Sequence, residues 1–389
     1  MVSGEFVIIM TMGTIIYIGG FELPDKNAAA HRVLNNGKIF RELGYDVVFI
    51  SIDRSINFNS VCSNPEKIQG FDTWFIPYPQ SNQQWLHHLC DIKIFLSIVE
   101  KYSDVKAVIC YNYQTVAFMK IKKYCKVNRI KIMADCTEWY STKGTNIIFM
   151  IIKGIDTFFR MRIVQKQLDG LIVISKYLEN YYRKSKNVIR IPPLVDLSEL
   201  KWNQPVTRVD DGKIRFVYAG SPGQSKDKLN LIVDWLREQQ RENIEFNIIG
   251  ITKEQYLRYY PKHIEVLNAL HEYIHFFGRI SHNEALQQIV LADFTIFLRE
   301  NNRTTKAGFP TKFVESISCG TPVITNRNSD LSDYLVNGEN GFFVSKDINS
   351  DMQIIFASGE EKLQIIKDNL NRNIFDYRNW CEQLINIID

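Results

Sequence analysis

A glycine-bearing loop followed by a short helix is the part of this sequence best suited to chemistry. Residues 308–310 read Gly-Phe-Pro, and they open a predicted helix because proline is favoured at a first helical position. Gly320 supplies the stop signal of that helix. The free N–H groups at such a helix N-terminus attract phosphate. The candidate ligand-binding residues here are Gly308, Phe309, Pro310 and Thr311.

Charged side chains accompany this predicted helix. Lys306 and Lys312 carry full positive charges, and Glu315 lies three residues after Lys312 on the same helix face. A lysine and an acid beside a helix N-terminus can hold the diphosphate and the ribose hydroxyls of a nucleotide. Helix N-termini are common, so an ordinary helix–strand unit with a solvated Lys–Glu pair stays open on these residues alone.

Strand and helix patterns alternate along most of the chain. Strands are predicted at 14–18, 47–52, 72–77, 105–110, 130–134 and 170–174, and again at 214–219, 246–250, 274–278, 294–298 and 322–325. Apolar strands joined by helices predict parallel sheets with right-handed crossovers. The polar segment 197–212 separates the two series, so a chain of 389 residues is predicted to form two α/β domains.

The segment 299–341 resembles the nucleotide-sugar signature of retaining glycosyltransferases with the GT-B fold, the "group 1" or family 4 class. Members carry two Glu residues separated by seven others, then Gly-x-Pro-Val-Ile and Asn-Gly-x-x-Gly. This chain matches with Glu315, 320–324 and 337–341, and it carries Ala307 in place of the first Glu. The resemblance covers roughly 14–389 and implies two doubly wound, Rossmann-like parallel-sheet domains that face each other across a cleft.

The resemblance also implies boundaries. Residues 1–196 would form an acceptor-side domain, with 1–11 as an extension, and 197–212 would be a linker. Residues 213–372 would bind the nucleotide sugar, and a helix over 373–389 would cross back to the first domain.

Candidate residues outside the signature follow from the same resemblance. For the donor, the turn Gly19-Gly20 would approach the phosphates, Gly220 with Lys226 or Lys228 would clamp the diphosphate, and Gly278, Arg279 and Ile280 would hold the nucleobase. Acceptor-side candidates follow the first predicted strand: Glu22, Asp25, Lys26 and His31. Asp135 and Glu138, which follow the predicted strand 130–134 in a loop that resembles the acceptor-side loop of the family, are catalytic candidates. Open α/β sheets bind ligands at this edge. The residues themselves also allow a surface role for His31 and a helix-capping role for Asp135.

The implied reaction is transfer of a sugar from a nucleoside-diphosphate sugar, UDP- or GDP-linked, to a hydroxyl of a glycan or lipid-linked acceptor in surface polysaccharide biosynthesis. Retention of anomeric configuration is implied as well. No Asp-x-Asp occurs in the sequence, so neither a metal nor a cofactor is expected. Lysines, Arg299 and helix N–H groups would stabilise the departing diphosphate. Two alternatives stay open: a GT-B sugar-nucleotide epimerase, and an inactive GT-B subunit that assists a partner transferase, which Ala307 makes conceivable.

Composition limits the partners. The 47 basic and 43 acidic residues are too balanced to favour nucleic acid, and seven dispersed cysteines indicate a reducing cytosol. The apolar stretch 6–21 is interpreted as containing the buried first strand 14–18, because it is short for a membrane span and no basic residue precedes it as in a signal peptide. Segment 147–166 mixes apolar residues with lysine and arginine. It fits either a long helix with a core face or peripheral contact with the inner face of an anionic membrane.

Overall fold

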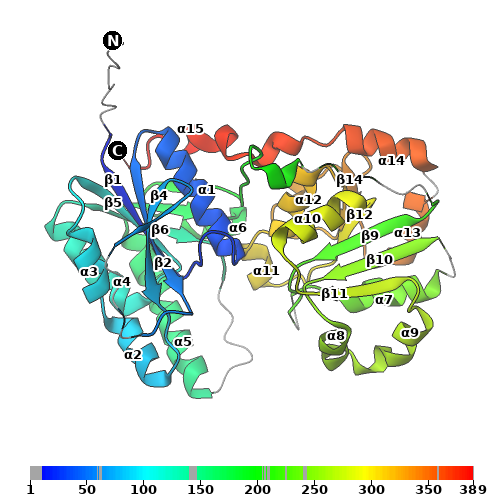
Figure 1. The fold of residues 1–389 in the computed structure, drawn as a ribbon, viewed down its shortest axis with the longest axis horizontal. Coiled ribbons are helices and arrows are strands. Elements are labelled where there is room, and N and C mark those ends of the chain that lie inside the picture. The colour runs from blue at the N-terminus through cyan, green and yellow to red at the C-terminus, as the bar shows by residue number, and fades with distance from the viewer. Residues whose placement is uncertain are drawn as a thin grey trace, which may run out of the picture. The chain divides into compact units, whose positions relative to one another are not determined.

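The chain forms two compact units in a computed structural model (Figure 1). The structure describes residues 11–58, 60, 64–139, 147–203, 205, 207, 211–223, 226–239, 243–356 and 359–388. Unit 1 contains the described residues up to Ile174, with Leu178–Leu194 and those from Tyr377 onward. Unit 2 contains Ser175–Tyr177 and Val195–Asp376. The predicted extension over 1–11 lies outside the described residues except for Thr11, as does part of the predicted linker.

Unit 1 is built on an eight-stranded sheet in the order β3-β4-β2-β1-β5-β6-β7-β8. All neighbouring strands are parallel except the pair β3 and β4. The strands are β1 (Thr14–Gly19), β2 (Asp46–Asp53), β3 (Glu66–Ile68), β4 (Phe71–Pro77), β5 (Val105–Tyr111), β6 (Lys131–Cys136), β7 (Gly170–Val173) and β8 (Val188–Arg190). Every residue of the central strand β1 is buried, as expected for a parallel sheet covered on both faces.

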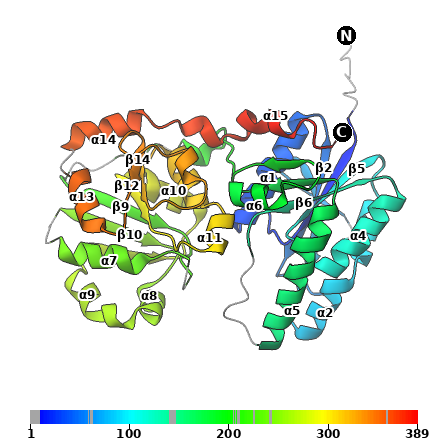
Figure 2. The same ribbon diagram turned by 180° about the vertical axis from the view of Figure 1, so that it is seen from behind.

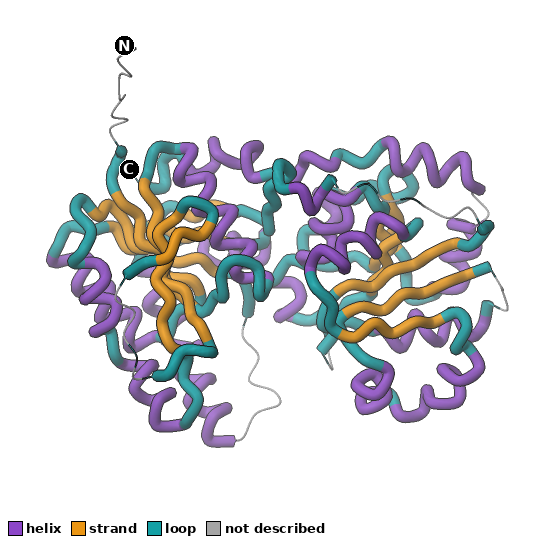
Figure 3. The backbone as a smooth tube through the Cα atoms, in the orientation of Figure 1, coloured by secondary structure: helices purple, strands orange, loops and turns teal. Residues whose placement is uncertain are grey.

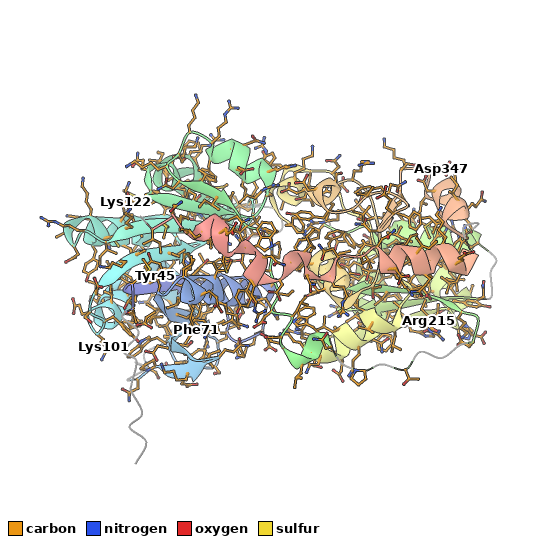
Figure 4. The ribbon with its side chains drawn as sticks, turned by 90° about the horizontal axis from the view of Figure 1, so that it is seen from above. Tyr45, Phe71, Lys101, Lys122, Arg215 and Asp347 are labelled. Atoms are coloured by element: carbon orange, nitrogen blue, oxygen red, sulfur yellow. The ribbon has the colours of Figure 1, made fainter. Side chains whose placement is uncertain are left out.

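Helices cover this sheet (Figure 3). They are α1 (Ala28–Glu42), α2 (Asn82–Cys90), α3 (Lys93–Val99), α4 (Thr115–Val127), α5 (Ile147–Phe159) and α6 (Lys176–Tyr182). Helix α1 begins as predicted, because the side chain of its N-cap Asn27 accepts a hydrogen bond from the N–H of Ala30 at 2.9 Å. Tyr45 and Phe71, which are labelled in Figure 4, belong to the buried hydrophobic core of unit 1.

Residues from Tyr377 onward complete the unit 1 core. Leu384 and Ile387 are fully buried in the same cluster as Tyr17 and Ile172. The Tyr377 hydroxyl donates a 3.0 Å hydrogen bond to Glu42 at the end of α1. The predicted single helix over 373–389 is wrong in form. This stretch contains the short turns Arg372–Phe375 and Tyr377–Trp380, followed by α15 (Cys381–Leu384).

Unit 2 contains a six-stranded sheet in the order β11-β10-β9-β12-β13-β14, with every pair parallel. The strands are β9 (Ile214–Ala219), β10 (Ile244–Ile249), β11 (Ile274–Gly278), β12 (Phe294–Phe297), β13 (Val323–Thr325) and β14 (Gly341–Phe343). The helices are α7 (Leu229–Glu238), α8 (Lys253–Tyr259), α9 (Ile264–Ala269), α10 (His282–Leu291), α11 (Arg303–Ala307), α12 (Thr311–Cys319), α13 (Ile348–Phe356) and α14 (Gly359–Asp368).

Two predicted elements differ from the structure in ways that affect function. Strand β6 continues through Asp135 to Cys136, so Asp135 lies within the strand and not after it. The predicted helix over 147–166 is α5 followed by a π-helical turn at Arg160–Val164 and a short 3-10 turn. Among the described residues, no helix is both long enough and apolar enough to cross a bilayer.

Candidate functional site

Three neighbouring strands of unit 2 end in glycines at the carboxyl edge of the sheet. Gly220 follows β9, Gly250 follows β10 and Gly278 ends β11, all with positive φ. The N–H of Gly220 donates to the carbonyl of Ile249, and the N–H of Gly250 donates to that of Gly278. A Cβ on Gly250 would lie 2.3 Å from the Gly220 carbonyl oxygen, so only glycine fits there. These turns bring backbone close to the edge where α/β sheets bind ligands.

The loop after β9 folds back onto the end of β12. The N–H of Lys228 donates to the carbonyl of Leu298, and the N–H of Glu300 donates to the carbonyl of Lys226. Asp227 and Arg299 therefore face each other in an isolated antiparallel bridge. This pairing turns the Asp227 side chain into the protein and leaves the side chain of Lys226 exposed.

Asp227 is the centre of a buried cluster of four polar side chains. The Tyr218 hydroxyl donates to Asp227 Oδ2 at 2.7 Å, and Lys312 Nζ contacts both Asp227 and the Tyr218 hydroxyl, the latter at 2.8 Å. Arg299 Nε lies 3.4 Å from Asp227 Oδ1. The exposed fractions are 0% for Tyr218, 1% for Asp227, 5% for Arg299 and 8% for Lys312. The cluster, called here the Asp227 cluster, unites residues that are up to 94 positions apart in the chain.

Burial and charge oppose each other in the Asp227 cluster. Burial alone would raise the pKa of Asp227, but Lys312 and Arg299 outweigh it and hold that pKa below its usual value. Burial lowers the pKa of Lys312 to about 8, although the carboxylate of Asp227 counteracts the effect. Burial likewise lowers the pKa of Arg299 and raises that of the Tyr218 hydroxyl.

The Asp227 cluster carries one positive charge more than it can neutralise internally. Two cations, Lys312 and Arg299, share the single carboxylate of Asp227. Arg299 Nε and Nη1 are buried and have no hydrogen-bond partner among the residues that the structure describes. A buried guanidinium normally satisfies its donors, so these nitrogens are suited to a group with several acceptor oxygens.

Helix α12 begins beside this surplus charge. Its N-cap, Pro310, provides no side-chain cap, and Lys312 belongs to the first turn. Gly220 is also adjacent, because a Cβ there would lie 3.3 Å from Lys312 Cε. A helix N-terminus, two cations and a glycine turn together form a site suited to a phosphate group.

Glu315 lies one turn further along α12, close to the start of α10. Its Oε1 atom is 3.4 Å from His282 Nε2, and both side chains are only partly exposed. Helix α10 begins with a capping box formed by Ser281 and Glu284, which fixes His282 directly after the predicted nucleobase turn at 278–280. The structure thus brings Glu315, Lys312 and that turn to one edge of unit 2.

The remaining predicted lysines of unit 2 are solvent-accessible. Lys228 forms a 2.6 Å ion pair with Glu300, with both side chains more than a third exposed. Lys306 is exposed on the short helix α11, which the sequence interpretation had treated as part of a loop. Arg279 is exposed and Ile280 partly so.

The Gly-Phe-Pro loop is anchored by its aromatic residue. Phe309 is buried and packs against Phe313, Tyr334 and Phe375. Ser329 Oγ donates to the Gly308 carbonyl at 2.5 Å, which fixes the loop ahead of Thr311. Ala307, at the position where the resembling family carries Glu, is fully buried.

Asp135 is corrected from a catalytic candidate to a buried structural residue of unit 1. It is 0% exposed and forms an ion pair with Arg32 Nη2 at 2.8 Å. It also accepts a 2.6 Å hydrogen bond from Tyr17 and a 3.3 Å hydrogen bond from Asn36. These contacts join β1, α1 and β6, and they leave no part of the carboxylate accessible to a substrate. Glu138, after the strand, is exposed.

The other unit 1 candidates surround the end of β1. Glu22 binds Asn27 Nδ2 at 3.3 Å and Arg54 Nε at 3.1 Å, so it supports the loop that leads into α1. Asp25 and Lys26 are exposed, and His31 is partly exposed on α1. Of the turn glycines, Gly19 is buried and Gly20 is exposed. Gly19 lies against Tyr111, because a Cβ there would be 2.4 Å from the Tyr111 carbonyl oxygen.

Each unit also has a cavity at the carboxyl edge of its own sheet. The unit 1 cavity is about 610 Å³ and is lined by residues that include Ile18, Pro77, His87, His88, Asp91 and Tyr113. The unit 2 cavity is about 350 Å³ and is lined by residues that include Ser221, Pro222, Gly250, Ile251, Gln255 and Tyr259. These volumes suit small-molecule groups.

Sequence reasoning missed Asp227, Tyr218, His282 and the histidines of the unit 1 cavity. Asp227 stands between the two predicted lysines 226 and 228, and a lone acid in a basic loop was the available signal. Its partners become visible only when β9, β12 and α12 are assembled.

Comparisons with known proteins bear on the fold. Residues 203–357 match the family described as "Glycosyl transferases group 1". The chain is similar to a sucrose-phosphate synthase from Thermosynechococcus elongatus (15% identity, TM-score 0.68), with 96% of this chain and 97% of that chain covered. It is similar to HepE from Anabaena, whose structure was solved in complex with UDP and glucose. The sequence identity is 12% and the TM-score 0.64, with 96% of this chain and 98% of HepE covered. It is also similar to the lipopolysaccharide outer core galactosyltransferase WaaB. The sequence identity is 15% and the TM-score 0.60, with 96% of this chain and 99% of WaaB covered. No curated protein matches the chain. The chain therefore has the GT-B fold, and residues 203–357 match the model of the group 1 glycosyl transferase family.

Proposed function

We propose that this protein transfers a sugar from a nucleoside-diphosphate sugar to a hydroxyl of a glycan or lipid-linked acceptor, with retention of configuration and without a metal ion. The family match and the fold support sugar transfer from a nucleotide sugar. The observation that carries the proposal is the surplus positive charge of the Asp227 cluster beside the N-terminus of α12.

In the proposed complex, the diphosphate lies between Arg299 and the first turn of α12. The unpartnered Arg299 nitrogens and Lys312 then gain an anionic partner. The diphosphate becomes more negative as the sugar leaves, so fixed cations stabilise the transition state more than the ground state. The only carboxylate of the cluster is occupied by Lys312 and Tyr218. The cluster therefore supplies positioning and charge, and no nucleophile.

The nucleoside lies along the same edge of unit 2. Glu315 accepts hydrogen bonds from two ribose hydroxyls, and the turn at 278–280 contacts the base. HepE, whose solved structures include complexes with UDP and with UDP-glucose, makes a uridine nucleotide the first donor to test. A guanosine nucleotide is the second.

The unit 1 cavity is the proposed acceptor end. His87 Nε2 lies 3.1 Å from Asp91 Oδ2, and His88 Nε2 lies 3.0 Å from Gln114 Nε2. Burial lowers the pKa of His88, which favours the neutral ring, and the Gln114 amide can donate a hydrogen bond to its Nε2. WaaB is described as a lipopolysaccharide galactosyltransferase. That description supports a glycan or lipid-linked acceptor for a surface polysaccharide, made at the cytoplasmic side.

The test is calorimetric binding of UDP and GDP to wild type and to Arg299→Gln. Removing Arg299 leaves Lys312 and Asp227 as a balanced pair, so the variant is expected to fold. We expect its diphosphate affinity to fall at least about tenfold, because a charge-assisted hydrogen bond is worth about 1.5–3 kcal/mol. Arg237→Gln, on the exposed side of α7, is the matched control. Unchanged affinity in Arg299→Gln would refute this placement of the diphosphate.

The buried Ala307 favours one alternative, an inactive GT-B subunit that assists a partner transferase. Such a subunit binds the nucleoside diphosphate but releases no sugar. A sugar-nucleotide epimerase instead changes the donor sugar without any acceptor. Following a bound sugar nucleotide by NMR, with and without acceptor glycans, separates transfer, epimerisation and mere binding.

A further inference from the structure

Helix α5 of unit 1 presents its apolar side chains to solvent. Ile147, Ile151, Ile155 and Phe159 repeat every four residues, with exposed fractions of 74%, 57%, 54% and 45%. Phe158 and, in the following turn, Ile163 extend the same surface. A helix of a soluble domain normally turns such a stripe towards the core. Here the stripe faces outward. Within α5 the polar Thr157 is buried, and in the following turn Arg160 is buried together with Met161 and Val164.

The neighbouring helix α4 enlarges this apolar surface. Val116 and Met119 are 45% and 55% exposed, and α4 packs against α5 and against α2 (Figure 2). The combined surface is called here the docking face and comprises Val116, Met119, Ile147, Ile151, Ile155, Phe158, Phe159 and Ile163. Scattered exposed hydrophobic residues need no explanation, but a contiguous group of this kind marks an interaction site.

The charges around the docking face are almost all positive. Segments 115–127 and 147–167 contain eight basic residues, of which Arg160 is buried, and one acidic residue, Asp156. Asp156 is turned inward, where its carboxylate accepts the N–H of Thr115 at 2.7 Å. Arg162 lies over the Phe158 ring, 4.5 Å from its centroid. The whole chain has a net charge of only +4, so acidic residues slightly outnumber basic ones elsewhere.

We propose that the docking face binds the surface of an anionic membrane, with α5 lying in the plane of the lipid headgroups. Helix α5 has 13 residues, and a membrane span needs about 20. Apolar side chains flanked by lysine and arginine are the pattern of a helix that lies in the interface. Because the face is strongly basic, a second copy of the same face would repel it. The exposed isoleucines favour lipid over nucleic acid, which offers them no apolar partner. This inference is independent of the proposed sugar transfer.

The test is sedimentation of the full chain with phosphatidylcholine vesicles, with and without phosphatidylglycerol. We expect binding only to the anionic vesicles, and we expect it to weaken as salt rises, because charges are screened over about 10 Å at 0.1 M salt. Hydrogen exchange is a second measurement that needs no variant. Added anionic vesicles are expected to protect the backbone amides of α4 and α5. Absence of binding at low salt, or protection located elsewhere, would overturn the proposal.

Variants separate the apolar and charged contributions. Ile151→Asn with Ile155→Asn is expected to weaken vesicle binding by at least about tenfold. Lys123→Gln with Arg162→Gln is expected to weaken it roughly 25-fold, at about fivefold for each basic residue near an anionic leaflet. The matched controls lie on unit 2: Leu231→Asn with Ile264→Asn, which are 45% and 52% exposed, and Arg237→Gln with Lys262→Gln.

Binding of UDP or GDP and the melting temperature are measured for each variant, so that a folding defect or a failed donor site is recognised separately. Equal vesicle binding by wild type and the isoleucine variant refutes the docking face. So does a dimer, seen by light scattering, that the isoleucine variant dissociates, because a second copy of the chain then covers the face.

Discussion

We predict that Lys312 makes nucleotide binding and protein stability depend on pH in opposite directions. Burial lowers its pKa to about 8 from the ordinary value of 10.5. In the ligand-free protein the charged lysine is therefore unfavourable, and the unfolded chain binds more protons between these two pH values. Stability consequently increases as the pH rises from about 8 towards 10.5, and this gain is lost as the pH falls through 8. The full difference is about 3 kcal/mol, at 1.36 kcal/mol per pKa unit.

Diphosphate binding reverses this preference, because an anion beside Lys312 favours the protonated amine. We predict that the affinity for a nucleoside diphosphate falls above pH 8, approaching tenfold per pH unit. The second ionisation of a phosphate lies near pH 6, so the phosphate groups of the ligand contribute little to the change in this range, and inorganic pyrophosphate serves as the probe that has no titrating base. Calorimetric titrations between pH 7 and 10 give the slope.

The variant Lys312→Met isolates the effect. It keeps Asp227 paired with Arg299 and Tyr218, so we expect a folded protein whose affinity is weaker at pH 7 and nearly independent of pH. Denaturant unfolding of wild type and Lys312→Met gives the stability difference at each pH and cancels other titrating groups. Lys262→Met, at an exposed position, is the control that keeps the wild-type slope. The reasoning fails if the wild-type affinity is flat from pH 7 to 10, or if Lys312→Met retains the slope.

Four further substitutions test the assignments above. Glu315→Gln should lower nucleoside-diphosphate affinity about tenfold by calorimetry, and wild-type affinity would mean that the ribose lies elsewhere. Lys228→Ala should lower kcat more than it raises KM, because its proposed role is to stabilise the departing diphosphate; a pure KM effect in steady-state kinetics would contradict this. Asp135→Asn should cost about 3–5 kcal/mol in denaturant unfolding, because it leaves Arg32 buried without its partner, and an unaltered unfolding midpoint would restore Asp135 as a site candidate. Ala307→Glu should lower the melting temperature by about 5 °C or more, since it buries an unpaired carboxylate; a stable variant with altered donor choice would show that the position faces the sugar.

Local signals in the sequence were sufficient for most of the fold. The predicted strand 214–219 coincides with β9, and the helix between Pro310 and Gly320 coincides with α12, because apolar runs, a proline start and a left-handed glycine stop act within a few residues. The ends of the predicted strands were less accurate than their positions. Extending β6 by two residues moved Asp135 from a loop into the core, since one strand residue more or less decides whether a carboxylate meets water or Arg32.

The Asp227 cluster was beyond sequence reasoning for a physical reason. The pairing of Asp227 with Arg299 depends on β9 lying beside β12, and its contact with Lys312 depends on where α12 starts above them. Lysines 226, 228, 306 and 312 are alike in the sequence, and only burial distinguishes Lys312 from the exposed three. The roles of all four, and of the glycine turns, stay predictions until the binding experiments are done.

The packing of residues 377–388 sets an order for synthesis. Unit 1 contains the start of the chain, yet Leu384 and Ile387 are fully buried in its core. The ribosome must therefore complete all of unit 2 before unit 1 can close its hydrophobic core. Domains are usually expected to fold from the N-terminus onward during translation, and here the first-made domain has to wait for the last. A chain truncated after residue 376 and released from the ribosome should accordingly contain a protease-resistant unit 2 and a protease-sensitive unit 1.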